Sequence, residues 1–321
     1  MNSQRIIAGV KNRFSRLSDR PYEWLLMNSR SEEKERFDAM QKDFMLSAER
    51  LCRADLGRFI DPLWKGMNET FLKEMKNGIP FNFLRHSLIG FTMFTQKSGK
   101  LMQSQIRILR RTFPEHVLKA VLREDPVGAP MIMQHSYLTS HNSIHLLSHV
   151  ARFEETTGKS IASMDTIVEW GGGYGRLAVL VDRLKASKAY TYIIIDTPLF
   201  SSIQALYLSA VLGVGRVNFI DSAEKSIVSG KINILPLNFI EQCDAVKADL
   251  FMSTWALSES SPFAQKFVLE RRMYSAEHVL VAFQDKNVNL PNAEGVREIA
   301  RMSGAAVEDI PYLSQNHYIF K

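Results

Sequence analysis

The sequence predicts a mixed α/β protein, in which a helical N-terminal region precedes a mostly parallel sheet that ends in an antiparallel strand pair. Three observations support this fold class. Apolar residues recur at helical spacing before a Pro- and Gly-rich segment, residues 125–130. Beyond that segment, short β-branched runs alternate with helix-type segments, as in parallel sheets with helices on both faces. The last two strand candidates are joined by too few residues for a parallel crossover, so they must pair antiparallel.

Length and composition are those of a globular protein. The chain has 321 residues, of which 45% are hydrophobic, enough to bury a sizeable core. No apolar run approaches the roughly 20 residues that a membrane-spanning helix needs, and the early apolar segment "IIAGV" is too short for a signal peptide. Cys52 and Cys243 lie far apart, which argues against a disulfide framework. We therefore expect a cytoplasmic protein without a transmembrane segment.

The first 125 residues are predicted to be helical. In residues 31–56 the apolar residues Phe37, Met40, Phe44 and Leu51 recur at helical spacing. Residues 67–76 form a second helix candidate, and the aromatic-rich segment 79–94 is interpreted as a buried helix. Such apolar stripes must pack on the rest of the chain or on a second copy of it.

The positive charge is concentrated in the same N-terminal region. Residues 1–125 contain 23 Lys and Arg against 15 Asp and Glu, whereas residues 126–321 contain 17 against 19. The two signs alternate along "RSEEKERFDAMQKD", which is typical of a solvated helix face. Because no basic stripe is interleaved with aromatic residues and no zinc-finger spacing occurs, we expect no binding to nucleic acid.

The remainder, residues 126–321, is predicted to be one α/β domain. The expected strands and helices are strand 166–169, strand 190–195, strand 216–220, strand 249–254, strand 278–283, strand 306–310, strand 317–320, helix 141–155, helix 177–186, helix 202–211, helix 262–275 and helix 292–302. These are seven strands, of which the last two form the antiparallel pair.

The stretch "IVEWGGGYGR" places Gly171, Gly172, Gly173 and Gly175 directly after the first strand. Such a turn lets a ligand approach the backbone closely, where a Cβ atom would collide with it. The dinucleotide pattern G-x-G-x-x-G would need its third glycine at Arg176. The spacing is instead G-x-G-x-G, preceded by an acidic residue, Glu169.

This pattern resembles the first motif of S-adenosylmethionine-dependent methyltransferases with a Rossmann-like, seven-stranded sheet. The resemblance implies S-adenosylmethionine as cofactor, with Glu169 orienting its ammonium group. Asp196 closes the second strand, and the resemblance gives it the two ribose hydroxyls. Asp221 ends the third strand, where this fold often contacts the adenine amino group. The segment "KINILPLNF" is the alternative source of that contact.

Within this superfamily, the chain is similar to a family of sugar O-methyltransferases found among proteins of polysaccharide and glycan biosynthesis. The similar stretches are "VEWGGGYGRLAVL", "IIIDTPLFSSIQALYLS" and "ADLFMSTWALSES", within residues 135–321. The resemblance implies a sugar or glycan acceptor. Residues 1–125 would then act as a lid, select the acceptor or form a homodimer. The alternatives are a methyltransferase for a small molecule or protein side chain, and a non-catalytic binding or scaffold protein of the same fold.

Methyl transfer to a hydroxyl group needs a base that takes the proton. Glu259 follows the fourth strand, which places it beside the sulfur end of the cofactor. Its alternative role is to cap the helix that begins near Pro262. Tyr174 and Trp255 are candidates for stacking on the cofactor or the sugar.

Three histidines, His141, His145 and His149, share one face of a predicted helix. A metal pair is possible at this spacing, but no third ligand is identifiable nearby. We expect His141, nearest the helix start, to reach the site as the second catalytic candidate. His135 and Asp285 are alternative bases, and Glu259 with Asp285 could hold a magnesium ion.

Overall fold

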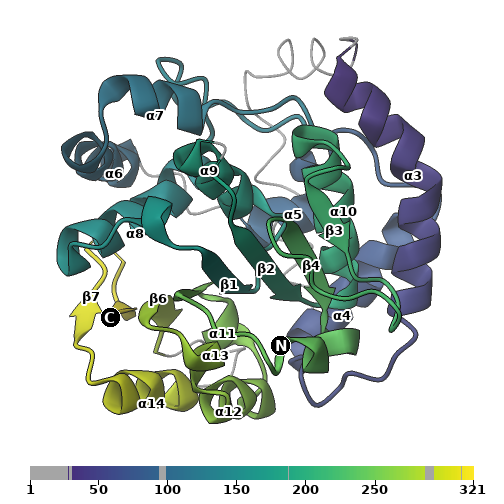
Figure 1. Ribbon diagram of the computed structural model, residues 1–321. Coiled ribbons are helices and arrows are strands. Elements are labelled where there is room, and N and C mark those ends of the chain that lie inside the picture. Colours follow the sequence, from purple (N-terminus) through teal and green to yellow (C-terminus); the bar gives the residue numbers. More distant parts are fainter. Residues whose placement is uncertain (1–27, 29–30, 94–98, 187, 286–292, 312) are drawn as a thin grey trace.

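The computed structural model describes residues 28, 31–93, 99–186, 188–285, 293–311 and 313–321 (Figure 1). They form an eight-stranded sheet in the order β3-β4-β2-β1-β5-β6-β8-β7. The strands are β1 (Thr166–Trp170), β2 (Thr191–Asp196), β3 (Val217–Phe219), β4 (Ile232–Pro236), β5 (Leu250–Thr254), β6 (His278–Gln284), β7 (Val307–Asp309) and β8 (Asn316–Phe320). All pairings are parallel except β6 with β8 and β7 with β8. The predicted fold class is confirmed, including the antiparallel C-terminal pair.

One strand, β4, was not predicted. Its five residues are all buried, and it lies between β2 and β3. No strand was expected in this segment, which was named only as the alternative source of the adenine contact, "KINILPLNF". As a result β3, the third strand along the chain, lies at the sheet edge instead of beside β2.

Helices cover both faces of the sheet. The described α-helices are α3 (Glu32–Leu51), α4 (Pro62–Glu74), α5 (Ser87–Thr92), α6 (Gly99–Thr112), α7 (Glu115–Leu122), α8 (His141–Thr157), α9 (Arg176–Lys185), α10 (Pro198–Leu212), α11 (Ala256–Glu259), α12 (Pro262–Glu270), α13 (Arg272–Ser275) and α14 (Glu294–Ser303). Side chains alternate along each strand. Ile167 therefore packs with α8, α9 and α10, whereas Val168 packs with α12 and α14 on the opposite face (Figure 1).

The N-terminal helices form an outer layer on the first of these faces. Helix α3 packs against α10, and α6 packs against α8. Helix α3 starts at Ser31, whose hydroxyl accepts the Lys34 N–H at 3.2 Å, and it buries Phe37 and Phe44 in the core that also contains Ile167. Segment 79–94 is not one helix: Phe83–Arg85 forms a 3₁₀ turn before α5, and residue 94 lies outside the described residues. Helices α6 and α7 were not predicted.

The predicted linker is anchored to the domain behind it. The Arg176 side chain, at the start of α9, is fully buried and donates to Asp125 Oδ2 at 2.9 Å and Ser143 Oγ at 2.8 Å. It also donates to the Leu122 carbonyl and lies 3.3 Å from Glu124 Oε2. The described parts of the two predicted regions thus share one core and one ion-pair cluster. None of the described helices has the length and apolar character needed to cross a membrane.

Candidate functional site

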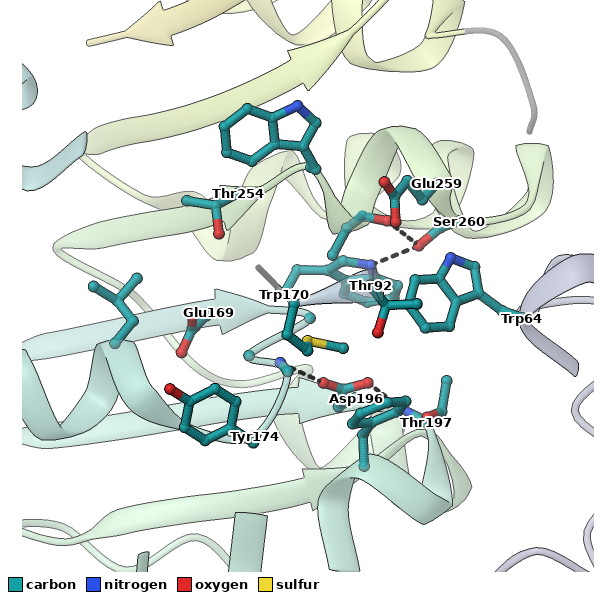
Figure 2. Close-up of a pocket in the computed structure, with 18 of the residues that line it drawn as sticks. Trp64, Thr92, Glu169, Trp170, Tyr174, Asp196, Thr197, Thr254, Glu259 and Ser260 are labelled. Carbon is teal, nitrogen blue, oxygen red and sulfur yellow. Dashed lines mark hydrogen bonds between the residues drawn. The ribbon is translucent and has the colours of Figure 1, made fainter. Parts of the chain in front are cut away.

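A cavity of about 580 Å³ opens at the carboxyl ends of β1, β2 and β5, where open α/β sheets bind ligands (Figure 2). It extends along the sheet edge from Leu237, after β4, to Asn316, at the start of β8. The N-terminal region contributes part of the wall through Phe59, Trp64 and Met93. The cavity is therefore built from both predicted regions.

The glycine loop follows β1 in tight contact with its own chain. A Cβ atom on Gly171 would meet Ala256 Cβ, and one on Gly173 would lie 2.7 Å from Met93 Sδ. Both glycines have positive φ angles, +77° and +58°. The sequence suggested that a ligand requires the bare backbone at these positions. The structure shows a further reason within the chain: the packing of the loop against α11 and Met93 already excludes side chains at Gly171 and Gly173.

Two carboxylates flank this loop. The Tyr192 hydroxyl donates to Glu169 Oε2 at 2.9 Å. Asp196 accepts the Thr197 N–H at 2.7 Å and the Gly173 N–H at 3.2 Å. Burial raises the pKa of each carboxyl group to about 7, although these hydrogen bonds oppose the rise. Both side chains line the cavity, and their contacts to the ammonium group and the ribose stay predictions.

Glu259 also lines the cavity, at the end of α11. Burial raises its pKa to about 7, and a hydrogen bond from the Trp64 side chain opposes the rise. Figure 2 shows it close to Trp64 and Ser260, on the opposite side of Trp170 from Asp196. Glu259 does not cap the next helix, because the Ser261 hydroxyl accepts the Ala264 N–H at 3.1 Å.

The histidines of α8 differ from the prediction. His141 is not among the described residues that line the cavity; its Nε2 lies 3.1 Å from Gln105 Oε1. His145 lines it instead, but both ring nitrogens are engaged, Nδ1 with Gln105 Nε2 at 2.6 Å and Nε2 with His149 Nε2 at 3.2 Å. Burial lowers the pKa of His145 well below its usual value. His145 therefore supports Trp255, on which its ring stacks, rather than serving as a free base.

Two other candidates, Asp221 and His135, are not among the described residues that line the cavity. Asp221, at the end of the edge strand β3, is paired with Arg50 and Lys225. Leu237, after β4 in the alternative segment "KINILPLNF", lines the cavity instead. His135 is exposed and, among the described residues, is not part of the lining.

The structure does not support a magnesium site at Glu259 and Asp285. Asp285 binds Arg297 at 2.5 Å and His317 at 2.8 Å and is not one of the described lining residues. In the part of the chain that the structure describes, no three His, Cys, Asp or Glu side chains group as metal ligands would.

Tyr174 and Trp255 both line the cavity, as expected. Trp255 has a φ of +65°, a strained conformation for a non-glycine residue, and its indole N–H donates to Asn316 Oδ1 at 2.6 Å. Sequence reasoning missed Phe59, Trp64 and Met93, because no motif in the N-terminal region marks them.

No protein-family model and no curated protein matches the chain. Solved structures with a similar fold include mitomycin 7-O-methyltransferase, with 14% identity and a TM-score of 0.35. The match covers 69% of this chain and 66% of that one, so this chain spans just under two thirds of the length of that protein. An O-methyltransferase family protein from Burkholderia thailandensis has 12% identity and a TM-score of 0.36, over 86% and 92% of the two chains. Magnesium protoporphyrin IX methyltransferase from Synechocystis, with bound SAM, has 9% identity and a TM-score of 0.38, over 70% and 98%.

Proposed function

We propose that the protein is an S-adenosylmethionine-dependent O-methyltransferase that acts on a hydroxyl group of a sugar or glycan. The observation that carries this proposal is the cavity in which Glu169, the glycine loop and Asp196 meet at the carboxyl ends of neighbouring parallel strands. Among the described residues, neither these two carboxylates nor Glu259 forms an ion pair with Lys or Arg. A ligand that carries positive charge suits such a site.

The order of the strands assigns parts of the cavity. In this proposal Glu169 binds the ammonium group of the cofactor and Asp196 accepts both ribose hydroxyls. The adenine ring then extends toward Leu237, beyond β2. The space beyond β1, bordered by Thr254, Trp255 and Asn316, remains for the acceptor. Aromatic faces beside hydroxyl and amide groups suit a sugar ring.

Glu259 is the proposed base. It lies on the acceptor side of β1, and a pKa of about 7 suits a base near neutral pH. Its carboxylate takes the proton of the acceptor hydroxyl while the oxygen forms a bond to the methyl carbon. S-adenosylmethionine, when bound, would supply that methyl group and would be left as S-adenosylhomocysteine. Trp64 orients Glu259 by its hydrogen bond and closes the cavity from the N-terminal side.

The N-terminal region is proposed to select the acceptor, because Phe59, Trp64 and Met93 form part of the wall. Its apolar stripe on α3 is buried against α10 within the same chain, so a homodimer is not needed to cover that stripe. The homodimer and the cytoplasmic location stay predictions.

Calorimetry tests the cofactor. S-adenosylmethionine and S-adenosylhomocysteine are expected to bind, and NAD is not, because the loop lacks the dinucleotide spacing. Tight NAD binding without any response to S-adenosylhomocysteine would refute the proposal.

A panel of neutral and acidic glycans, incubated with S-adenosylmethionine and analysed by mass spectrometry for an added methyl group, tests the acceptor. With an acceptor in hand, Glu259→Gln should bind S-adenosylhomocysteine normally and lose about 10²–10⁴-fold in turnover, the usual contribution of a positioned base. Glu270→Gln, on the exposed surface, is the matched control. Normal turnover of Glu259→Gln would exclude the base assignment.

A further inference from the structure

Gln204 connects the two halves of the proposed cofactor site. It lies on α10, eight residues beyond Asp196, and is fully buried. Its Nε2 donates to the Gly173 carbonyl at 2.9 Å and to Asp196 Oδ2 at 2.8 Å. The Gly173 N–H donates to the same carboxylate oxygen at 3.2 Å. The loop, the carboxylate and the amide therefore form one closed hydrogen-bonded ring.

The orientation of this amide is determined by its partners. Both partners are acceptors, so only the NH₂ group of Gln204 can face them. Its Oε1 has no hydrogen-bond partner among the residues that the structure describes. A buried acceptor without a partner costs free energy that an apolar side chain of similar size would avoid. Packing alone therefore does not explain an amide at this position.

We propose that Gln204 is a positioning residue that holds the glycine loop and the Asp196 carboxylate in the geometry that binds the ribose diol. This inference rests on the proposed function, because it concerns the same cofactor site. Gln204 is not one of the described residues that line the cavity, so it acts through Asp196 and Gly173.

The electrostatics of Asp196 support this role. Burial raises the pKa of Asp196 to about 7, and the hydrogen bonds from Thr197, Gln204 and Gly173 oppose the rise. From β1, the titratable group that faces it is Glu169, whose own pKa is raised by burial and, to a smaller extent, by the charge of Asp196. Among the described contacts of Asp196, those from the loop and α10 are neutral donors. Loss of the Gln204 donor should therefore leave Asp196 harder to ionise.

Two substitutions test the proposal through the pH dependence of S-adenosylhomocysteine binding. Gln204→Glu keeps the shape but adds a carboxyl group beside Asp196. The midpoint of the affinity–pH curve should rise by about one unit, and affinity at pH 7 should fall by about fivefold, because the ionised fraction of Asp196 at that pH drops from about one half to about one tenth. Gln204→Met removes the donor without adding charge and should show a smaller shift in the same direction.

Asn233→Asp is the matched control. Asn233 is also a fully buried amide, on β4, and it contacts Val228, Lys231, Asn218 and the Tyr192 carbonyl rather than the glycine loop. This substitution should lower the melting temperature and leave the midpoint of the binding curve unchanged.

The melting temperature of the ligand-free protein as a function of pH gives a second readout. When folding raises the pKa of a carboxyl group, the protein loses stability as the pH rises from the pKa of that group in the unfolded chain to its pKa in the folded protein. For Asp196 this window ends near pH 7, and both Gln204 variants should extend it to higher pH.

The two hypotheses fail in different ways. Suppose that the wild type binds S-adenosylhomocysteine, and that neither Gln204 variant shifts the midpoint of the affinity–pH curve or the pH window of the melting temperature. Gln204 then has only a packing role, and the inference is wrong. If the wild type binds no S-adenosylhomocysteine, the proposed function fails. In that case a shift of the ligand-free stability curve still supports the coupling of Gln204 to Asp196, and an unchanged curve rejects it.

Discussion

Two groups of carboxylates lie on either side of the glycine loop, and they are neutralised differently. Behind the loop, Glu124 and Asp125 contact Arg176, which is fully buried although it also borders the cavity. In front of it, Glu169 and Asp196 face the cavity. Among the described residues, neither of these two has a Lys or Arg partner.

The difference separates a structural site from a binding site. Behind the loop the chain supplies its own cation, and the cluster attaches the N-terminal region to the first turn of α9. In front of the loop the carboxylates are supported by hydrogen bonds but lack a cation. Burial raises the pKa of each of these carboxyl groups to about 7. A bound ligand with positive charge would compensate their negative charge.

The largest expected effect is the loss of the paired cluster. Arg176→Met leaves Glu124 buried without its cation and leaves Asp125 with only Arg183, so it should lower the free energy of unfolding by about 3–5 kcal/mol. Urea unfolding measures this. Arg111→Gln, which breaks the exposed pair with Glu155, is the control and should cost at most about 1 kcal/mol. A loss below about 1 kcal/mol for Arg176→Met would remove the basis of the comparison.

Removal of a charged side chain in front of the loop should instead stabilise the ligand-free protein. Glu169→Gln removes an uncompensated charge, so at pH 8 the ligand-free protein should gain about 1–3 kcal/mol of stability. At pH 5, where Glu169 is protonated, the gain should vanish. Affinity for S-adenosylmethionine should fall about 10–100-fold through the lost charge-assisted hydrogen bond. Destabilisation at pH 8 would show that Glu169 is structural.

The two carboxyl groups in front of the loop should also make the affinity for the cofactor depend on pH. Because Glu169 and Asp196 are expected to bind the cofactor in ionised form, affinity should rise as pH increases through about 7. The slope should be about tenfold per pH unit for each group that must ionise. Calorimetry in buffers of different ionisation enthalpy should detect proton release near pH 7. A flat profile between pH 6 and 8 would mean that neither group changes its ionisation on binding.

The smallest expected effect concerns Trp64. Trp64→Phe removes the hydrogen bond to Glu259, should raise the pKa of Glu259 further and should cost about 1 kcal/mol of stability. The acidic limb of the pH–rate profile should move to higher pH. Phe200→Leu, which alters the ring that packs edge-on against Trp64, is the control and should leave this limb in place. If the acidic limb of the pH–rate profile is unchanged in Trp64→Phe, the ionisation of Glu259 does not control the rate.

Much of the fold, and the part of the site formed by the glycine loop and its two carboxylates, depend on local patterns that can be recognised in the sequence alone. A strand that ends in Glu169, four glycines and a helix specify a loop at the sheet edge. Asp196 closes the next strand, and parallel pairing brings both to that edge. The antiparallel end of the sheet followed from the short connection between its last two strands. No knowledge of distant contacts was needed for any of these.

Contacts between distant segments were decided only by the tertiary structure. The strand β4 displaced β3 to the edge and removed Asp221 from the site. The packing of α6 on α8 engaged His141 and directed His145 to the cavity. The contact of Trp64 with Glu259 and the bonds of Gln204 to the loop join residues far apart in sequence. Periodicity shows which face of an element is apolar, but which neighbour covers that face is settled only when the whole core packs.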